Sequence, residues 1–169
     1  NRKVMIEYYK EIGDWLRGRE TKNVLDIGMS MFNIYNKSFF NNDLIDYYQI
    51  DIELSNAVKQ RLESIAIVDS FICLEKKYPH YIDHFDVIIS YGVLGYIEFT
   101  PKEIQEYLET AVRLLKKDGK LYLKLDIVHM KEKFRKENIV KEEQVLTYFK
   151  ITSSQIVDNE FIFYVLIKK

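Results

Sequence analysis

Two acidic residues stand at the ends of short apolar runs, where a nucleoside could be bound. The first run, Val24-Leu25-Asp26-Ile27, passes into Gly28, and the second, Tyr47 to Ile52, ends near Asp51. A glycine turn lets the backbone approach a ligand closely, and a carboxylate at the tip of the next strand can accept hydrogen bonds from ribose hydroxyls. The pair therefore predicts a nucleoside site at the carboxyl edge of a parallel sheet.

The elements that position this pair follow from the hydrophobic periodicity. A helix precedes the first run, with Met5, Tyr8, Tyr9, Ile12 and Leu16 on one face and Gly18 as its stop signal. Short apolar runs predict further strands at 65–68, 85–90 and 121–125, and a helix is expected from Ser55 to about Glu63. This alternation of strands and helices is typical of a mostly parallel sheet.

The second half of the chain carries clearer boundary signals. Thr100-Pro101-Lys102-Glu103 is a capping box with proline at the first helical position, and Asp118-Gly119 is expected to end that helix. Its inward face is Ile104, Leu108, Ala111 and Leu115. A charged helical segment over 130–149 then leads to two β runs, 150–157 and 160–167, which Asp158-Asn159 joins as a hairpin.

Two stretches carry a resemblance to a known family. Residues 24–33 resemble a motif of two apolar residues, an acid, an apolar residue and three alternating glycines, with Gly28 at the first glycine and Ser30 and Phe32 at the others. Residues 85–97 resemble a strand and its ligand-facing loop in small-molecule methyltransferases. Residues 114–121 resemble the segment that leads from the following helix into the next strand. The chain thus resembles the class I S-adenosylmethionine-dependent methyltransferases over most of its length.

The resemblance implies a fold and an activity. The fold would be a three-layer αβα sandwich with a Rossmann-like, mostly parallel seven-stranded sheet that ends in an antiparallel hairpin. The activity would be methyl transfer from S-adenosylmethionine to an oxygen or nitrogen nucleophile of a small molecule or of a sugar-like or carrier-linked acceptor. Many relatives carry Glu-His where this chain has Gly95-Tyr96, so their histidine base is absent.

The resemblance also implies site residues. The residues expected to bind the cofactor are Asp26, Gly28, Met29, Ser30, Asp51, Ile52, Asp69, Ser70, Ser90 and Tyr91. Asp26 would orient the amino-acid end of the cofactor or only cap the turn, Asp69 and Ser70 would contact the adenine edge or form a solvated strand end, and Met29 would line the cofactor or fill a gap. Tyr91, Tyr96, Asp126 and His129 are candidates for a catalytic base, with pocket walls as the alternative for the two tyrosines.

Composition narrows the class of protein. A chain of 169 residues with 47% hydrophobic content suits one domain, and its start at Asn1 is compatible with a domain cut from a longer protein that has neighbouring domains. Because no apolar run approaches the ~20 residues that span a bilayer, we expect a soluble, cytoplasmic protein. A net charge of −1 gives no whole-protein attraction to nucleic acid.

Metal chemistry is not expected. Cys73 is the one cysteine, which excludes an internal disulfide and a cysteine-built zinc site. His80 and His84 are four apart, but Pro79 disfavours the helix that would align them as ligands. The charged residues Lys131–Lys136 are expected to form a solvated helix face, or to attract an anionic substrate.

Two alternatives remain open. One is a non-catalytic domain that keeps the fold and acts as a binding or interaction module, which Ser30 and Phe32 favour. The other is a different nucleotide-binding α/β protein. A nicotinamide-binding Rossmann domain would continue with parallel units and need a second domain, so the terminal hairpin disfavours it.

Overall fold

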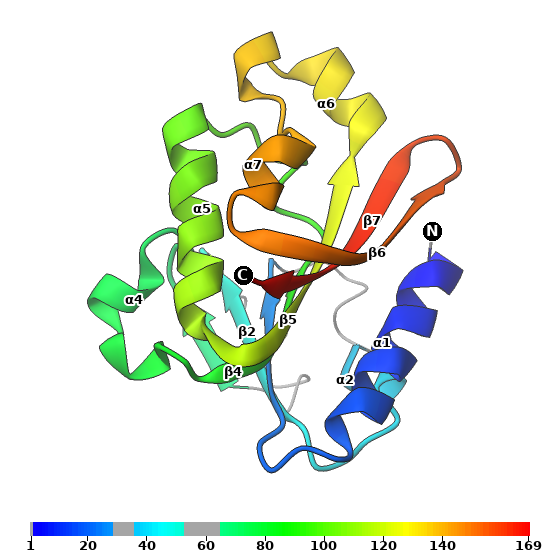
Figure 1. The fold of residues 1–169 in the computed structure, drawn as a ribbon, viewed down its shortest axis with the longest axis vertical. Helices are drawn as coiled ribbons and strands as arrows, with labels where there is room; N and C mark the ends of the chain where they lie inside the picture. Colours follow the sequence, from blue (N-terminus) through cyan, green and yellow to red (C-terminus); the bar gives the residue numbers. More distant parts are fainter. Residues whose placement is uncertain (1, 29–35, 53–64) are drawn as a thin grey trace.

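A single sheet lies between two layers of helices in the computed structural model, which describes residues 2–28, 36–52 and 65–169 (Figure 1). The strands are β1 Asn23–Ile27, β2 Asp46–Asp51, β3 Ile65–Val68, β4 Phe85–Ser90, β5 Leu115–Asp126, β6 Phe149–Val157 and β7 Phe161–Lys168. The helices are α1 Arg2–Leu16, α2 Asn36–Phe39, α4 Leu74–Lys77, α5 Pro101–Leu114, α6 Ile127–Lys133 and α7 Glu142–Leu146, with 3₁₀ turns at Pro79–Tyr81 and Lys136–Asn138.

The strand order is β3-β2-β1-β4-β5-β7-β6. Strands β1 to β5 pair in parallel, whereas β7 runs antiparallel between β5 and β6. The predicted fold class, a mostly parallel seven-stranded sheet that ends in an antiparallel hairpin, is confirmed. The parallel strands bring their carboxyl ends to one edge of the sheet, where ligands bind in open α/β folds.

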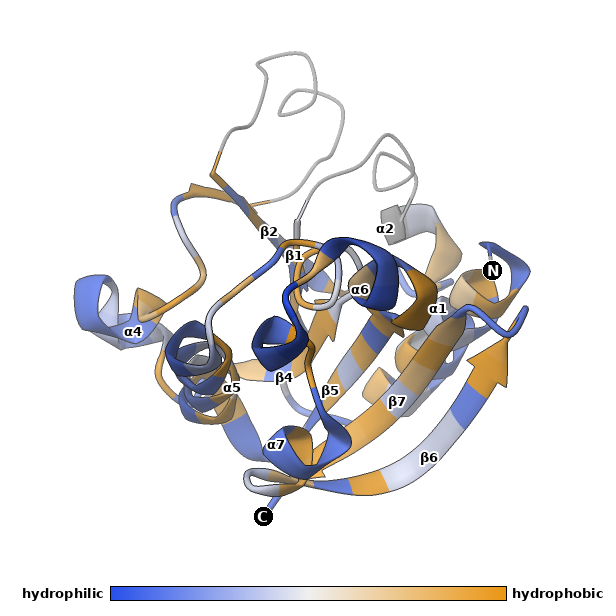
Figure 2. Cartoon of the chain, turned by 90° about the horizontal axis from the view of Figure 1, so that it is seen from above, coloured by the Kyte–Doolittle hydropathy of each residue, from blue (hydrophilic) through white to orange (hydrophobic). Residues whose placement is uncertain are grey.

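Helices lie on both faces of the sheet (Figure 2), and successive side chains of a strand point to opposite faces. Leu25, Ile88 and Leu121 belong to the core cluster that contains the buried face of α5. Val24 and Tyr122 belong to the second cluster, which contains the buried face of α1. The predicted inward residues of α1 are buried except Met5, which is partly buried; those of α5 are buried, but Leu115 belongs to β5. The capping box at Thr100 begins α5 as expected.

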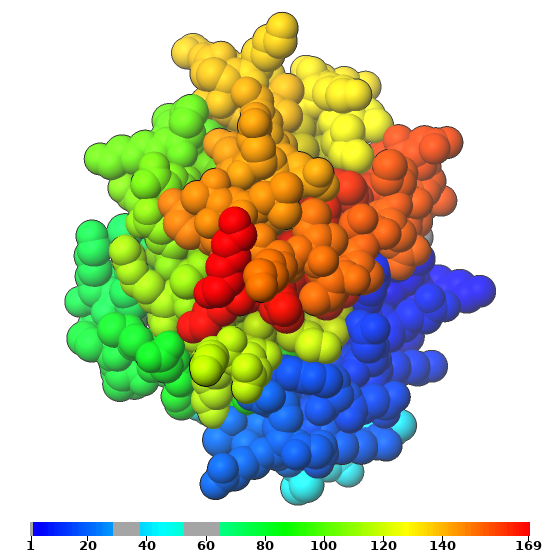
Figure 3. All heavy atoms as spheres, viewed as in Figure 1, coloured from blue at the N-terminus to red at the C-terminus, as the bar shows by residue number. Residues whose placement is uncertain are grey.

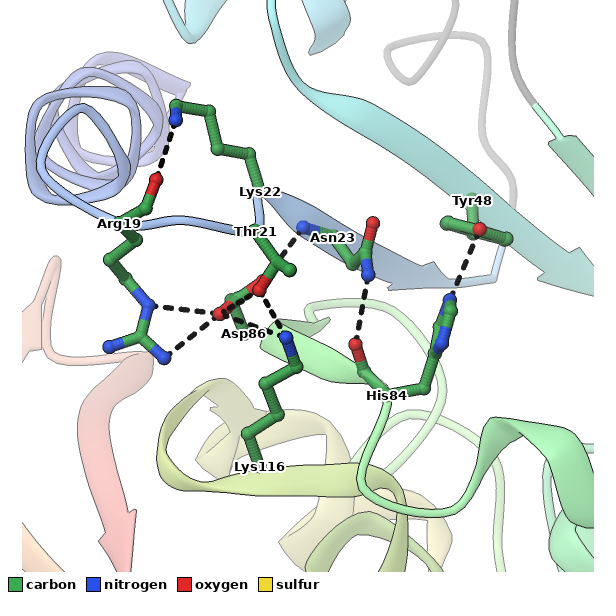
Figure 4. A network of polar contacts seen from close by, with 8 residues as sticks. All are labelled: Arg19, Thr21, Lys22, Asn23, Tyr48, His84, Asp86 and Lys116. Atoms are coloured by element: carbon green, nitrogen blue, oxygen red, sulfur yellow. Dashed lines mark hydrogen bonds and ion pairs between the residues drawn. The ribbon is translucent and has the colours of Figure 1, made fainter.

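A buried carboxylate ties the amino ends of the central strands together (Figure 4). Asp86 of β4 is fully buried and accepts hydrogen bonds from Arg19, from the Thr21 hydroxyl and from the Asn23 amide. The Asn23 side chain donates in turn to the His84 carbonyl oxygen at 3.0 Å. Since β1 starts at Asn23, this network fixes the start of β1 beside the start of β4, at the end of the sheet opposite the ligand edge.

One predicted boundary was wrong. The structure ends α5 at Leu114 and starts β5 at Leu115, so Asp118-Gly119 lies inside the strand. The pairing of β4 with β5 shifts register between Phe85 and Val87, which is the signature of a bulge. A Cβ at Gly119 would lie 3.2 Å from the Asp86 carbonyl oxygen and 2.9 Å from Leu115. Glycine is therefore needed at this position because another part of the backbone approaches closely, and it does not end a helix.

The helix predicted over 130–149 is broken into α6, a 3₁₀ turn and α7. The break begins at Phe134, which has extended backbone angles. The Glu98 carboxylate accepts hydrogen bonds from the Arg135 amide and the Asn138 side chain, each at 2.8 Å, and so stabilises the non-helical path. The helix predicted from Ser55 to Glu63 lies outside the described residues.

The predicted hairpin is confirmed. Asp158 and Asn159 both have positive φ, at 56° and 52°, and the Glu160 amide closes the turn on the Val157 carbonyl oxygen at 3.1 Å, so the strands are joined by the three residues 158–160 and not by two. The hairpin packs beside α1, and atoms of the two segments adjoin on the surface (Figure 3). Gln155 donates a hydrogen bond of 2.6 Å to the Tyr8 hydroxyl across this contact.

Candidate functional site

A cavity of about 280 Å³ opens where β1, β2 and β3 end. Five of the predicted cofactor-binding residues, which come from three separate strand ends, line it: Gly28, Asp51, Ile52, Asp69 and Ser70. The loop after β4 and a buried face of α5 complete the wall. The predicted residues Met29 and Ser30, together with Met31 and Phe32, lie outside the described residues.

Gly28 provides the turn at the end of β1. Its φ is +84°, which side chains other than glycine rarely adopt, and its amide donates to the Ile50 carbonyl oxygen at 2.8 Å. A Cβ added there would lie 2.7 Å from Cγ2 of Val93, a second residue of the cavity wall. The position thus requires glycine both for its backbone angle and for the space it leaves beside the cavity.

Asp51 ends β2 at the rim of the cavity. It is half-buried, and the next residue, Ile52, is 70% exposed although its side chain is apolar. The Asp51 carbonyl oxygen accepts a hydrogen bond from the Asp69 amide at 3.0 Å, which ties the end of β2 to the end of β3. A carboxylate is therefore presented to the cavity from a strand end that the neighbouring strand supports.

The Asp69 carboxylate is held by three donors from the residues that follow β3. Its carboxylate accepts hydrogen bonds from the Ser70 amide at 2.8 Å, from Lys77 at 2.6 Å and from the Tyr78 hydroxyl at 3.2 Å. The Lys77 ammonium and the Ser70 amide hold the pKa of Asp69 below its ordinary value. This arrangement fixes the loop that carries Ser70, Phe71 and Ile72 into the cavity wall.

Tyr107 of α5 is a wall residue that the sequence analysis missed. Its ring is fully buried, and its hydroxyl lies 2.7 Å from Oγ of Ser90, the last residue of β4. Burial raises the pKa of Tyr107, so its hydroxyl stays protonated. Ser90, which we predicted to touch the cofactor, is itself buried and reaches the wall through this hydrogen bond. The signal was available, because Tyr107 falls on the same helical face as Ile104 and Leu108.

Asp26 lies on the opposite face of the sheet from the cavity-lining Ile27. It is buried, and its Oδ2 accepts a hydrogen bond from the Tyr47 hydroxyl, which accepts one from Gln49 at 3.1 Å. Asp26 does not belong to the cavity wall formed by the described residues. Its position suits an indirect role, in which it braces β1 and β2 where Gly28 and Asp51 begin the site.

Tyr91 also points toward the α1 layer. Its ring lies 6.0 Å from that of Tyr9 and 5.7 Å from that of Phe163, measured between centroids. Its hydroxyl is buried and makes no hydrogen bond with any residue that the structure describes. Burial raises the pKa of Tyr91 well above its ordinary value, which opposes the formation of a tyrosinate that could act as a base.

The other three catalytic candidates are brought together beside the cavity. Tyr96 lines the cavity, and its ring is stacked on that of His129 with centroids 4.6 Å apart. Asp126 is the N-cap of α6 and accepts a hydrogen bond of 3.0 Å from the His129 amide. The wall residue Tyr96 is therefore backed by His129, whose amide is bonded to Asp126 at the end of β5.

No group of three or more potential metal ligands occurs within residues 2–28, 36–52 and 65–169. His80 lies in a 3₁₀ turn and its ring packs on Tyr81, whereas Nε2 of His84 lies 3.1 Å from the Tyr48 hydroxyl.

In the same described part of the chain, no helix has the length and apolar character needed to cross a membrane.

Comparison with known proteins identifies the fold. The sequence matches no protein-family model and no curated protein. N-methyltransferase NodS from Bradyrhizobium japonicum WM9 superposes with a TM-score of 0.71 over 99% of this chain and 96% of its own, at 12% identity. A Burkholderia thailandensis 1,6-didemethyltoxoflavin-N1-methyltransferase, solved with its acceptor and S-adenosylhomocysteine, gives 0.69 over 97% of this chain and 78% of its own, at 16% identity.

A third structure, the PH0226 protein from Pyrococcus horikoshii OT3, superposes with a TM-score of 0.66 over 99% of this chain and 91% of its own, at 17% identity. The chain therefore has the fold of class I methyltransferases, as its sequence motifs indicated. At these identities the likeness shows the fold, and the activity has to be argued from the site.

Proposed function

We propose that the protein transfers a methyl group from S-adenosylmethionine to an oxygen or nitrogen nucleophile of a small molecule. The observation that carries the proposal is the convergence of Gly28, Asp51 and Ser70 on one cavity from the ends of three parallel strands. This is the edge at which doubly wound folds bind nucleosides. Two of the structural neighbours were solved with S-adenosylhomocysteine.

The wall suits the cofactor. Gly28 leaves its backbone accessible at a point that a Cβ would fill, next to Val93. The Asp51 carboxylate would accept hydrogen bonds from the two ribose hydroxyls, which are charge-assisted contacts. Phe71 and Ile72 offer apolar surface for the adenine ring, and the Ser70 segment offers polar groups for its edge. None of these proposed contacts with the cofactor involves a metal ion.

The chemistry asks little of the protein beyond positioning. When bound, S-adenosylmethionine supplies an electrophilic methyl group on a sulfonium. The chain must then hold the acceptor nucleophile in line with it and exclude competing water, which can provide much of the rate acceleration. A base is needed only where the nucleophile must lose a proton. Tyr96 lines the cavity, His129 is stacked on its ring and Asp126 is bonded to the His129 amide, so these three residues are the candidates to receive that proton.

The acceptor is proposed to be a small molecule, including sugar-like or carrier-linked ones. The described residues form an open site whose rim carries the exposed side chains Ile52, Tyr96 and Ile97. An open site suits an acceptor that protrudes, or a neighbouring domain that closes over it. One neighbour in fold, the 1,6-didemethyltoxoflavin-N1-methyltransferase named above, was solved with bound 1,6-didemethyltoxoflavin.

Calorimetric titration with S-adenosylhomocysteine tests the proposal. One binding site is expected, and transfer activity should persist in the presence of a chelator. If neither heat nor a thermal shift is seen at millimolar ligand, the alternative of a non-catalytic module with a methyltransferase fold is favoured. The substitutions Ser30 and Phe32 in the glycine motif are the feature that supports that alternative.

A further inference from the structure

Tyr96 is a large aromatic side chain left open to solvent at the mouth of the cavity. It is 57% exposed and belongs to the cavity wall. Its backbone is fixed, because the amides of Tyr96 and Ile97 donate to the Val93 carbonyl oxygen at 3.1 and 2.9 Å. The ring is thus presented from a tight turn and not from a long loop.

His129 covers one face of this ring. The two rings are almost parallel, with an interplanar angle of 17° and 4.6 Å between centroids. Nε2 of His129 lies 2.9 Å from the Tyr96 carbonyl oxygen, which can only accept, so Nε2 is the donor. Because one face of the tyrosine is covered, its exposed area belongs to the opposite face and the ring edge.

His129 is itself held in place from two sides. Its amide donates to the Asp126 carboxylate at the start of α6, and the Phe134 ring packs edge-on against its ring at 5.5 Å. The stack therefore spans the loop after β4 and the helix after β5. A rigid aromatic surface of this kind loses little conformational entropy when a second ring is laid on it.

We propose that the free face of Tyr96 stacks on a flat aromatic or heteroaromatic ring of the methyl acceptor, and that His129 positions Tyr96 for this contact. The inference rests on the proposed function, since it names the class of acceptor for the same site. Ile52 and Ile97, which are 70% and 47% exposed, add apolar surface to the same rim. The Tyr96 hydroxyl makes no hydrogen bond with a described residue and is available to a polar substituent of that ring.

The test uses two uncharged probes that share a carbon skeleton, 2-naphthol and its saturated analogue decahydro-2-naphthol. The affinity of each protein for S-adenosylhomocysteine is measured first, and each probe is then titrated by calorimetry at saturating S-adenosylhomocysteine. The parent should bind 2-naphthol about tenfold more tightly than the saturated probe, as expected for ring stacking.

Three variants separate the ring from its support. Tyr96→Phe keeps the aromatic face and should keep the affinity ratio of the two probes. Tyr96→Leu keeps apolar volume and should bring the ratio close to one. His129→Leu should lower the ratio by loosening the tyrosine, an effect that a purely structural role of His129 would not produce.

A parent ratio near one, a ratio unchanged in Tyr96→Leu, or no binding of 2-naphthol at millimolar concentration would each overturn the inference. These outcomes leave the proposed function standing when S-adenosylhomocysteine binds. If S-adenosylhomocysteine does not bind the parent, the proposed function fails and the inference fails with it.

Discussion

Arg19 and Asp86 are joined by two guanidinium nitrogens, Nε and Nη2, that each lie 2.9 Å from Oδ1 of the carboxylate. The Asp86 side chain is 0% exposed, whereas that of Arg19 is 24% exposed. The Thr21 hydroxyl and the Asn23 amide also donate to it at 2.9 Å, and Lys116 Nζ lies 3.9 Å from Oδ1. The carboxylate is therefore fully compensated in a place that water does not reach, far from the ligand edge of the sheet.

Replacement of Asp86 by alanine should lower the free energy of unfolding by about 3 kcal/mol, because Arg19 and the Asn23 amide lose a buried partner. Asp86→Asn keeps the shape and should cost less. Urea unfolding can be followed through Trp15, whose ring lies 4.5 Å from the Arg19 guanidinium carbon. Asp118→Ala, an exposed position on the adjacent strand, is the matched control. Equal stability of Asp86→Ala and this control would contradict the structural role.

Replacement of Asp51 by alanine should weaken S-adenosylhomocysteine binding by at least about tenfold, since charge-assisted hydrogen bonds contribute roughly 1.5–3 kcal/mol each. Asp51→Asn should fall between alanine and the parent. Asp46→Ala is the matched control, because Asp46 is exposed at the other end of the same strand. Calorimetry on the folded variants compares their affinities for S-adenosylhomocysteine. If Asp51→Ala and Asp46→Ala bind it equally tightly, Asp51 is not the ribose-binding carboxylate at the end of β2.

Replacement of Gly28 by alanine should destabilise the fold by about 1–2 kcal/mol through the left-handed backbone alone, and should also weaken cofactor binding. The added Cβ would press on Val93, which lines the same cavity. Gly18→Ala is the control, since nothing lies within 4 Å of a Cβ there. Thermal unfolding with and without S-adenosylhomocysteine measures both effects. A variant with the parent's melting temperature and affinity would refute this account of the turn.

Replacement of Tyr91 by phenylalanine should raise the free energy of unfolding by about 1 kcal/mol, because it removes a buried hydroxyl without a described partner. Tyr107→Phe is the contrasting variant: it breaks the hydrogen bond to Ser90 and should cost about 1 kcal/mol. Chemical denaturation compares the two. Once an acceptor is known, loss of transfer activity in a stable Tyr91→Phe protein would restore Tyr91 as a catalytic candidate.

The parts of the fold that depend on local chemistry could be predicted. The capping box at Thr100 and the turn at Asp158-Asn159 have local physical causes, and both are found as expected. Gly28 and Asp51 could be paired because parallel strands end at one edge. The end of α5 could not be predicted, since the role of Gly119 depends on a backbone approach from another strand.

The rest of the site depends on contacts between distant segments. The stack of Tyr96 on His129 joins residues 33 positions apart and has no local signature. The orientation of Asp26 and Tyr91 toward the α1 layer follows from strand register, which a motif alone does not specify. Tyr107 could have been found from helical periodicity, but its contact with Ser90 needs the packed structure.

The hairpin between β6 and β7 determines when this sheet can be completed during synthesis on the ribosome. β7 is inserted between β5 and β6, and its residues Phe163 and Val165 complete the cluster that covers α1. Helix α1 therefore has no complete surface to pack on until residue 165 has emerged. Such sequence-distant pairing slows folding and leaves apolar surface open meanwhile. The Tyr8 face of α1 is thus an apolar surface of the nascent chain that stays uncovered until β7 has been made.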